Sequence, residues 1–196
     1  MDRLMNPIAL DLCCGKGGWA KGLIAAGWDV VGVDNEERFR AEYPGQFYCG
    51  DVLGRDCEAL VPSSTRTYDL VVASPPCQEF SRHDQPWTRK RNPPPPGTSI
   101  WEVCVRIAEE FGAPLILENV RGAQKFMGRA AWHCGPYYMW GDVPALMPKI
   151  RYRQKQSRSS SAIAERAEVP FDLALHIGRV FHPGPMRRPP QDEIFL

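Results

Sequence analysis

Short apolar runs alternate with stretches of helical spacing along the first part of the chain. The apolar runs cover residues 7–12, 28–33, 46–49 and 68–73, and the stretches of helical spacing cover residues 17–26 and 36–43. Such alternation is typical of parallel strands that are joined by crossover helices. The pattern therefore predicts an α/β, Rossmann-like fold with a mostly parallel sheet flanked by helices.

The pattern continues after a polar, proline-rich segment at residues 74–98. We expect a helix next, because Ser99-Ile100-Trp101-Glu102 is a capping-box sequence ahead of apolar positions at helical spacing. Residues 115–118 predict a fifth strand, and residues 137–140 are a weaker candidate for a sixth. A closing helix is expected near residues 170–181.

The composition is that of a folded globular protein. Of the 196 residues, 43% are hydrophobic and 24% are charged, so we expect one domain over residues 1–196 with loop insertions around residues 78–98 and 122–161. The apolar runs are shorter than the roughly 18 residues of a membrane span, and the first residues do not resemble a secretion signal. The 7 cysteines include no C-x-x-C pair, which argues against a disulfide framework or a zinc site. We therefore expect a cytoplasmic protein with no membrane contact and no metal.

Charge is distributed unevenly along the chain. Residues 1–80 carry 7 basic and 12 acidic side chains, whereas residues 81–196 carry 17 basic and 11 acidic ones. Basic clusters occur at Arg82, Arg89, Lys90 and Arg91, and at Lys149, Arg151, Arg153, Lys155 and Arg158. These clusters suit a phosphate backbone, although a solvated charged face is the alternative for either cluster alone.

A glycine-rich turn follows the first predicted strand. It reads Asp11-Leu12-Cys13-Cys14-Gly15-Lys16-Gly17-Gly18 and opens the first predicted helix, where a backbone can approach a ligand and N–H groups are free. Asp34, at the end of the second strand, can bind both hydroxyls of a ribose, and Asp51, at the end of the third, can hold an adenine amino group. The sequence therefore predicts a nucleotide-like cofactor, with an ordinary tight turn as the alternative.

Two cofactors fit this turn. Residues 15–20 match the dinucleotide pattern G-x-G-x-x-A, which leaves a nicotinamide cofactor open. Asp11 favours S-adenosylmethionine instead, because a carboxylate just before the glycines suits a cationic aminoacyl tail and would repel a pyrophosphate.

The fourth and fifth predicted strands end in reactive side chains. Pro75 and Pro76 fix the backbone just before Cys77, at the carboxyl end of a strand, so Cys77 is a candidate nucleophile rather than a buried, inert thiol. Glu118 ends the next strand and should lie beside Cys77 on the same edge of the sheet, with helix capping as its alternative role.

These motifs together resemble the cytosine-5 DNA methyltransferase family. The turn at residues 11–18 is similar to the family's D-L-F-x-G-x-G-G motif, Pro75-Pro76-Cys77-Gln78 is its P-P-C-Q motif, and Glu118-Asn119-Val120 is its E-N-V motif. Val169-Pro170-Phe171-Asp172-Leu173-Ala174 further resembles the V-P-x-x-L-A helix of its closing motif. The resemblance covers most of residues 7–120 and the remainder in patches.

The resemblance implies an S-adenosylmethionine-dependent methyltransferase fold that acts on a cytosine flipped out of DNA. In this reading Cys77 adds to C6, Glu118 binds at N3, and the loop at residues 80–98 closes over the base. Residues and resemblance together give these cofactor-binding candidates: Asp11, Leu12, Cys13, Gly15, Gly17, Gly18, Asp34, Asn35, Asp51, Val52 and Pro75.

The chain departs from the family pattern in three places. The family's Q-x-R-x-R motif has no clean counterpart, and Arg153 is the residue we assign to its base-contacting arginine. Glu168 replaces the Gly-Asn that usually precedes the closing motif, and residues 158–169 leave no room for the usual target-recognition domain. A homodimer or an accessory specificity protein is therefore left open as the source of site recognition.

The sequence thus predicts a DNA (cytosine-5-)-methyltransferase of a phage or restriction-modification type. Three alternatives remain. The same chemistry on RNA cytosine or a free pyrimidine nucleotide is one, a non-catalytic DNA-binding or cofactor-sensing module is the second, and an NAD-dependent oxidoreductase is the third. Intact Cys77 and Glu118 count against the last two.

Overall fold

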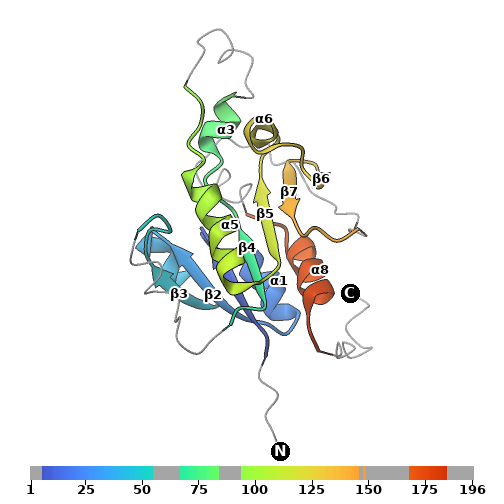
Figure 1. Ribbon diagram of the computed structural model, residues 1–196. Coiled ribbons are helices and arrows are strands. Elements are labelled where there is room, and N and C mark those ends of the chain that lie inside the picture. Colours follow the sequence, from blue (N-terminus) through green and yellow to red (C-terminus); the bar gives the residue numbers. More distant parts are fainter. Residues whose placement is uncertain (1–5, 55–66, 84–93, 146–147, 149–167, 185–196) are drawn as a thin grey trace, which may run out of the picture.

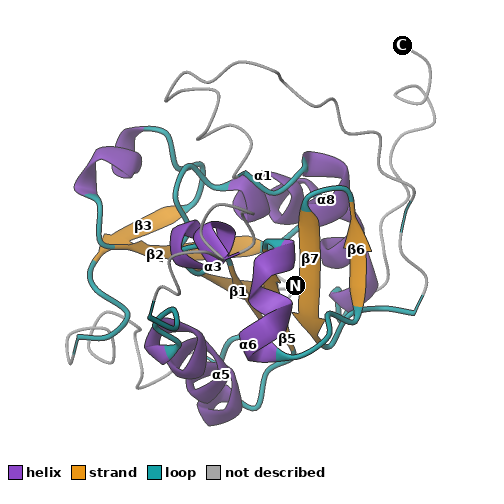
Figure 2. Cartoon of the chain, turned by 90° about the horizontal axis from the view of Figure 1, so that it is seen from above, coloured by secondary structure: helices purple, strands orange, loops and turns teal. Residues whose placement is uncertain are grey.

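The computed structural model describes residues 6–54, 67–83, 94–145, 148 and 168–184. Within them, one seven-stranded sheet runs through the molecule with helices on both faces (Figure 1, Figure 2). The strands are β1 (Ile8–Leu12), β2 (Asp29–Asp34), β3 (Gln46–Cys49), β4 (Leu70–Ala73), β5 (Leu115–Asn119), β6 (Trp132–Cys134) and β7 (Tyr137–Gly141). The predicted α/β fold with a mostly parallel sheet is confirmed.

The strand order is β3-β2-β1-β4-β5-β7-β6. Strands β1 to β5 pair in parallel, whereas β7 runs antiparallel to both β5 and β6. The order changes direction between β1 and β4, and open α/β sheets bind ligands outside the carboxyl ends of the strands at such a point. The glycine turn after β1 and Cys77 after β4 therefore leave the sheet at the same edge.

Alternate residues of β1 enter two different cores. Leu10 packs in the core beneath α5 (Ser99–Phe111), whereas Ala9 packs in the core beneath α1 (Gly18–Ala25) and α8 (Phe171–Phe181). Successive side chains of a strand point to opposite faces, so a strand covered on both faces must be apolar throughout. This explains why the first apolar run is continuous rather than alternating.

Helices α1 and α8 touch through small residues. A Cβ on Gly22 would lie 2.4 Å from the backbone nitrogen of Leu175, and one on Gly178 would lie 2.7 Å from Cβ of Ala26. Trp28 adds a hydrogen bond from its indole Nε1 to the carbonyl oxygen of Gly178, at 2.9 Å. The close approach fixes the segment that precedes α8 against the start of α1.

Two local predictions need correction. The expected helix forms as α5, but its N-cap is Thr98 and not Ser99, so the expected capping box at Ser99 does not form. The hydroxyl of Thr98 donates to Oε1 of Glu102 at 2.6 Å. The helical stretch at residues 36–43 is a 3₁₀ helix, η1 (Glu37–Ala41).

Three short helices complete the carboxyl edge of the sheet. They are α3 (Gln78–His83), inside the segment expected to be polar loop, η2 (Arg121–Ala123) and α6 (Gln124–Met127). Strand β6 was not predicted either, because three residues are too few for a periodicity to emerge. Among the described residues, no helix is long and apolar enough to span a membrane, and no cluster of three or more His, Cys, Asp or Glu could hold a metal ion.

Candidate active site

A cavity of about 510 Å³ opens at the carboxyl ends of β1, β2, β4 and β5. This volume is within the range of small-molecule sites. Ten of the predicted site residues line it, namely Cys13, Gly15, Gly18, Asp34, Asn35, Asp51, Val52, Pro75, Cys77 and Glu118. Asp11, Leu12 and Gly17, which were also predicted to bind the cofactor, are not among its lining residues.

The glycine turn is held against the end of β2. The backbone N–H of Gly15 donates to Oδ2 of Asp34 at 2.9 Å, and that of Cys14 donates to the carbonyl oxygen of Val33 at 3.1 Å. Gly15 has a φ of 49°, and a Cβ there would meet no protein atom within 4 Å. The turn therefore presents bare backbone to the cavity, as a bound nucleotide-like group requires.

The carboxylate of Asp34 already serves the backbone. Its Oδ1 accepts a hydrogen bond from the N–H of Glu36 at 3.0 Å, in addition to the bond from Gly15. Glu36 also lines the cavity and was missed from the sequence, although it lies only two residues after Asp34. Two carboxylates thus line the cavity at the carboxyl end of β2. Asp34 also holds the backbone of the glycine turn in place through its hydrogen bond with Gly15.

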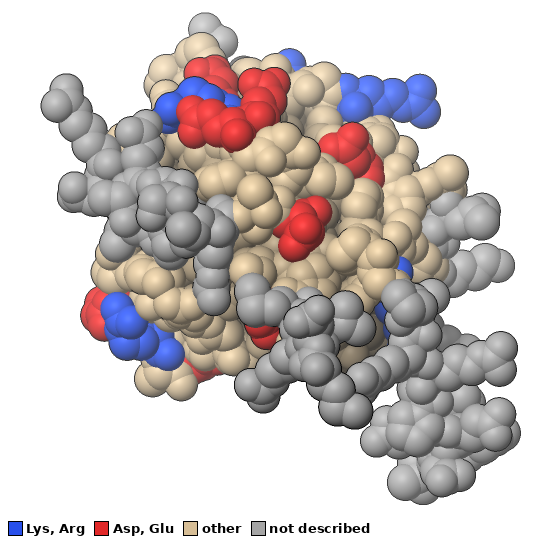
Figure 3. Space-filling model, turned by 60° about the horizontal axis from the view of Figure 1, so that its bottom comes forward, with Lys and Arg blue, Asp and Glu red and all other residues tan. Residues whose placement is uncertain are grey.

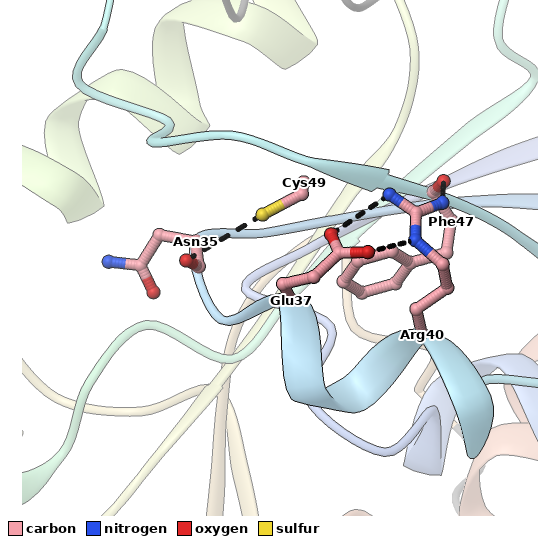
Figure 4. A network of polar contacts seen from close by, with 5 residues as sticks. All are labelled: Asn35, Glu37, Arg40, Phe47 and Cys49. Atoms are coloured by element: carbon pink, nitrogen blue, oxygen red, sulfur yellow. Dashed lines mark hydrogen bonds and ion pairs between the residues drawn. The ribbon is translucent and has the colours of Figure 1, made fainter.

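A network of polar contacts supports the segment that follows β2 (Figure 4). Nη1 of Arg40 donates to the carbonyl oxygen of Phe47 at 2.9 Å, and the same guanidinium pairs with Glu37. The thiol of Cys49 contacts the carbonyl oxygen of Asn35 at 3.8 Å. These contacts join η1 to β3 and so fix the loop that carries Asn35 to the cavity wall.

Asp11 lies behind the glycine turn and does not line the cavity. Its side chain is fully buried, and the hydroxyl of Tyr43 donates to its Oδ2 at 3.1 Å. Burial, above all, raises the pKa of Asp11 well above the ordinary carboxyl value. The expectation that this carboxylate contacts a cationic aminoacyl tail stays a prediction, and Asp11 is not among the residues that line the cavity.

Cys77 and Glu118 both line the cavity. Glu118 is 8% exposed, and burial raises its pKa to about 8 against the opposing effect of a hydrogen bond from Ser74. The pKa of Cys77 is raised as well, first by burial and then by the nearby charge of Glu118. The amide Nδ2 of Asn119 donates to the carbonyl oxygen of Pro75 at 2.9 Å and so ties the Cys77 segment to β5.

Comparison with known proteins identifies the family. The family model "C-5 cytosine-specific DNA methylase" matches residues 8–132. The chain belongs to this family. S-adenosylmethionine is therefore its cofactor, and the bare glycine turn beside strand-end carboxylates fits that group.

Individual relatives are similar over part of their length. The Type II methylase M.HgiDII of Herpetosiphon aurantiacus is 33% identical over 129 residues, which is 60% of this chain and 34% of that protein. A solved structure described as a DNA modification methyltransferase encoded within an E. coli prophage has 20% identity, a TM-score of 0.46, and coverage of 62% of this chain and 34% of that one. The S. pombe Dnmt2 methyltransferase has 17% identity, a TM-score of 0.42, and coverage of 62% and 36%. The chain thus spans about a third of the length of these relatives.

Tyr137 and Glu168 are among the further side chains that line the cavity and were not predicted to do so. Tyr137 enters from β7, and Glu168 enters from the segment before α8, where it pairs with Lys21 of α1. A Cβ on Gly18 would lie 2.8 Å from Cγ of Glu168, so this carboxylate packs directly on the start of α1. The departure from the family pattern at Glu168 was the one signal in the sequence that pointed to this position in the cavity wall.

Part of the predicted base-contacting machinery lies outside the described residues. This holds for Arg153, for the basic cluster at residues 149–158 and for most of the loop at residues 80–98. Arg82 is described, and it is exposed on α3.

Proposed function

We propose that this chain transfers a methyl group from S-adenosylmethionine to C5 of cytosine in DNA through a covalent adduct between Cys77 and C6. One observation carries the proposal. The nucleophile candidate Cys77 and the buried acid Glu118 line one cavity with the glycine turn, and the Asn119–Pro75 hydrogen bond couples their two strand ends. A cofactor-sensing module without catalysis would not need a thiol and a protonatable carboxyl group in contact with the same space.

The protonation states favour the addition step. At neutral pH Glu118, with its pKa of about 8, is mostly protonated and can donate a hydrogen bond to N3 of the base. Its neutral form also removes the negative charge that opposes ionisation of Cys77. The Cys77 thiolate can then add to C6, and the hydrogen bond at N3 stabilises the negative charge that develops on the ring.

Bound S-adenosylmethionine supplies the electrophilic methyl group that C5 accepts. Loss of the proton from C5 then breaks the C6–S bond, releases the Cys77 thiolate and restores the aromatic ring. We assign the backbone of Gly15 and Gly18 to the approach of the cofactor, and Glu36 together with Asp34 to its ribose hydroxyls. Asp51, with Val52 and Asn35, serves the adenine end. Glu168 takes the role expected of Asp11 and binds the α-ammonium group of the aminoacyl tail, because it is the carboxylate that lines the cavity next to Gly18.

DNA is the proposed substrate because exposed cations lie beside the cavity. Arg82 of α3, Arg121 of η2 and Lys125 of α6 are exposed at the carboxyl edge of the sheet. Nζ of Lys125 donates to the carbonyl oxygen of His83 at 3.0 Å, which joins α6 to α3. On the face in Figure 3, by contrast, the lysines and arginines of the described residues lie apart from one another with acids among them. Phosphate contacts are therefore expected next to the cavity.

The test is a methyl-transfer assay with three substrates. The full chain is incubated with tritiated S-adenosylmethionine and duplex DNA, RNA or cytidine nucleotides, and the product is analysed for 5-methylcytosine. We expect label in DNA, and a covalent complex with DNA that carries 5-fluorocytosine. Label in RNA or nucleotide alone would correct the substrate, and no label in any of them would contradict the proposed activity.

A further inference from the structure

Tyr137 is the first residue of β7, and its side chain reaches the cavity that holds Cys77 and Glu118. The residue is 8% exposed. Neither the glycine turn nor the Cys77 and Glu118 motifs include it. A phenol that lines a reaction cavity can provide a directed hydrogen-bond donor.

The strand register puts Tyr137 on the same face of the sheet as Glu118. Glu118 pairs with Met139 across the antiparallel β5–β7 ladder, and Tyr137 is two residues from Met139. Residues two apart share a face, and diagonal cross-strand neighbours are within reach of aromatic side chains. Tyr138 takes the other face, where it stacks on His133 with ring centroids 4.8 Å apart and an interplanar angle of 12°.

Electrostatics agree with this placement. The pKa of Tyr137 is raised by burial first, and then by the charges of Glu118 and Glu168. The phenol is thus within electrostatic range of both carboxylates. Its raised pKa also means that it stays a neutral donor throughout the physiological range.

The flipped cytosine has one hydrogen-bond acceptor left for such a donor. A protonated Glu118 can donate to N3 with one oxygen and accept from the N4 amino group with the other, which leaves the exocyclic O2 unpaired. Addition of a thiolate at C6 builds negative charge on both N3 and O2. A second donor at O2 would therefore bind the transition state more strongly than the ground state.

We propose that the hydroxyl of Tyr137 donates a hydrogen bond to O2 of the target cytosine and stabilises the ring charge while Cys77 adds to C6. This inference rests on the proposed function. The assignment of Arg153 as the base-contacting arginine stays a separate prediction, because Arg153 lies outside the described residues.

The experiment compares Tyr137→Phe with Tyr138→Phe in the full chain. Both changes remove one hydroxyl from neighbouring positions of β7, but only Tyr137 lines the cavity. Three quantities are measured: the affinity for S-adenosylhomocysteine by calorimetry, the rate of adduct formation with 5-fluorocytosine DNA, and kcat for methyl transfer. We expect Tyr137→Phe to lower the adduct rate and kcat by about 100-fold, as for loss of one oxyanion donor, with the cofactor affinity and melting temperature unchanged. Tyr138→Phe should leave all of them unchanged.

A substrate change tests the contact atom directly. DNA with 2-thiocytosine at the target replaces O2 by sulfur, a weak acceptor, so the wild-type rate should fall on this substrate. Tyr137→Phe should lose little more, because the same hydrogen bond is already gone. Unchanged rates for Tyr137→Phe, additive losses with 2-thiocytosine, or a loss confined to cofactor affinity would each overturn the assignment. A wild type that modifies no cytosine substrate would overturn the proposed function itself, and this outcome is distinct from the other three.

Discussion

Trp19 donates a hydrogen bond from its indole Nε1 to Oγ of Ser74, at 3.1 Å. Ser74 has one hydroxyl proton, and it is also the hydrogen-bond partner of Glu118. Because the indole can only donate, Ser74 accepts from Trp19 and its own proton is directed to Glu118. Trp19 of α1 thus orients the Ser74 hydroxyl so that its proton points to Glu118, the acid of the proposed mechanism.

Ser74→Ala should shift the pH dependence of methyl transfer. The Ser74 hydrogen bond lowers the pKa of Glu118, so its removal raises that pKa above about 8. In the proposed mechanism activity needs protonated Glu118 and is lost as pH rises through its pKa, so the alkaline limb of the pH–rate profile should move to higher pH. Trp19→Phe should move it in the same direction by less. An alkaline limb that stays in place in Ser74→Ala would contradict this coupling.

Glu118→Gln should abolish methyl transfer yet stabilise the protein in alkali. An unfolded carboxyl loses its proton near 4.5, whereas folded Glu118 keeps its proton up to about 8. The free energy of unfolding of the wild type therefore falls as the pH rises from about 4.5 to about 8. The stabilisation that protonated Glu118 contributes is complete only below about pH 4.5. The melting temperature of the variant minus that of the wild type should be larger at about pH 8.5 than at about pH 5. Glu109→Gln, on the exposed side of α5, is the control, and equal differences at both pH values would show that Glu118 is not protonated by burial.

Cys77→Ser should lose methyl transfer and adduct formation and still bind S-adenosylhomocysteine. A serine hydroxyl is a far weaker nucleophile than a thiolate at neutral pH. Cys134→Ser is the matched control, because Cys134 lies on β6 and is not a lining residue of the cavity. Near-normal turnover of Cys77→Ser would exclude a covalent mechanism through this residue.

Glu168→Gln should weaken binding of the aminoacyl tail alone. We expect the affinity for S-adenosylhomocysteine to fall by about tenfold or more, the effect of losing one charge-assisted hydrogen bond. The affinity for 5′-methylthioadenosine, which lacks the tail, should be unchanged in the same calorimetric titration. Glu42→Gln controls for the loss of an ion pair, because Glu42 pairs with Lys16 at 2.8 Å. Equal losses for both ligands would remove Glu168 from the tail subsite.

Gly15→Ala should weaken cofactor binding beyond its effect on stability. Gly15 and Gly112 both have positive φ, at 49° and 61°, and a Cβ on either would meet no protein atom within 4 Å. Each substitution should therefore cost about 1–2 kcal/mol of stability through backbone strain. Only Gly15 lines the cavity, so only its variant should also lose affinity for S-adenosylhomocysteine. Similar affinities in the two variants would mean that the cofactor does not approach Gly15.

The sequence predicts those residues of the cavity wall that stand at the carboxyl end of an apolar strand. Cys77 and Glu118 could be found because each follows a continuous apolar run, and the edge of a parallel sheet brings such positions together. The burial of Asp11 against Tyr43 could not be found, because Tyr43 is 32 residues away in the chain. Tyr137 was hidden for a similar reason. Its face is set by the register of β7 on β5, and local periodicity does not report register.

The contact between α1 and α8 also sets the order in which the molecule can be completed. The indole of Trp28 meets the carbonyl of Gly178 across 150 positions of the chain, and the segment before α8 forms part of the cavity wall. During synthesis on a ribosome, the cofactor pocket therefore stays open on one side until α8 has emerged and docked. Strands β1 to β5 can pair earlier. The long-range contact between α1 and α8 must form before the cavity wall is complete and S-adenosylmethionine can make all of its contacts. Cofactor capture is thus tied to the docking of α8 on α1.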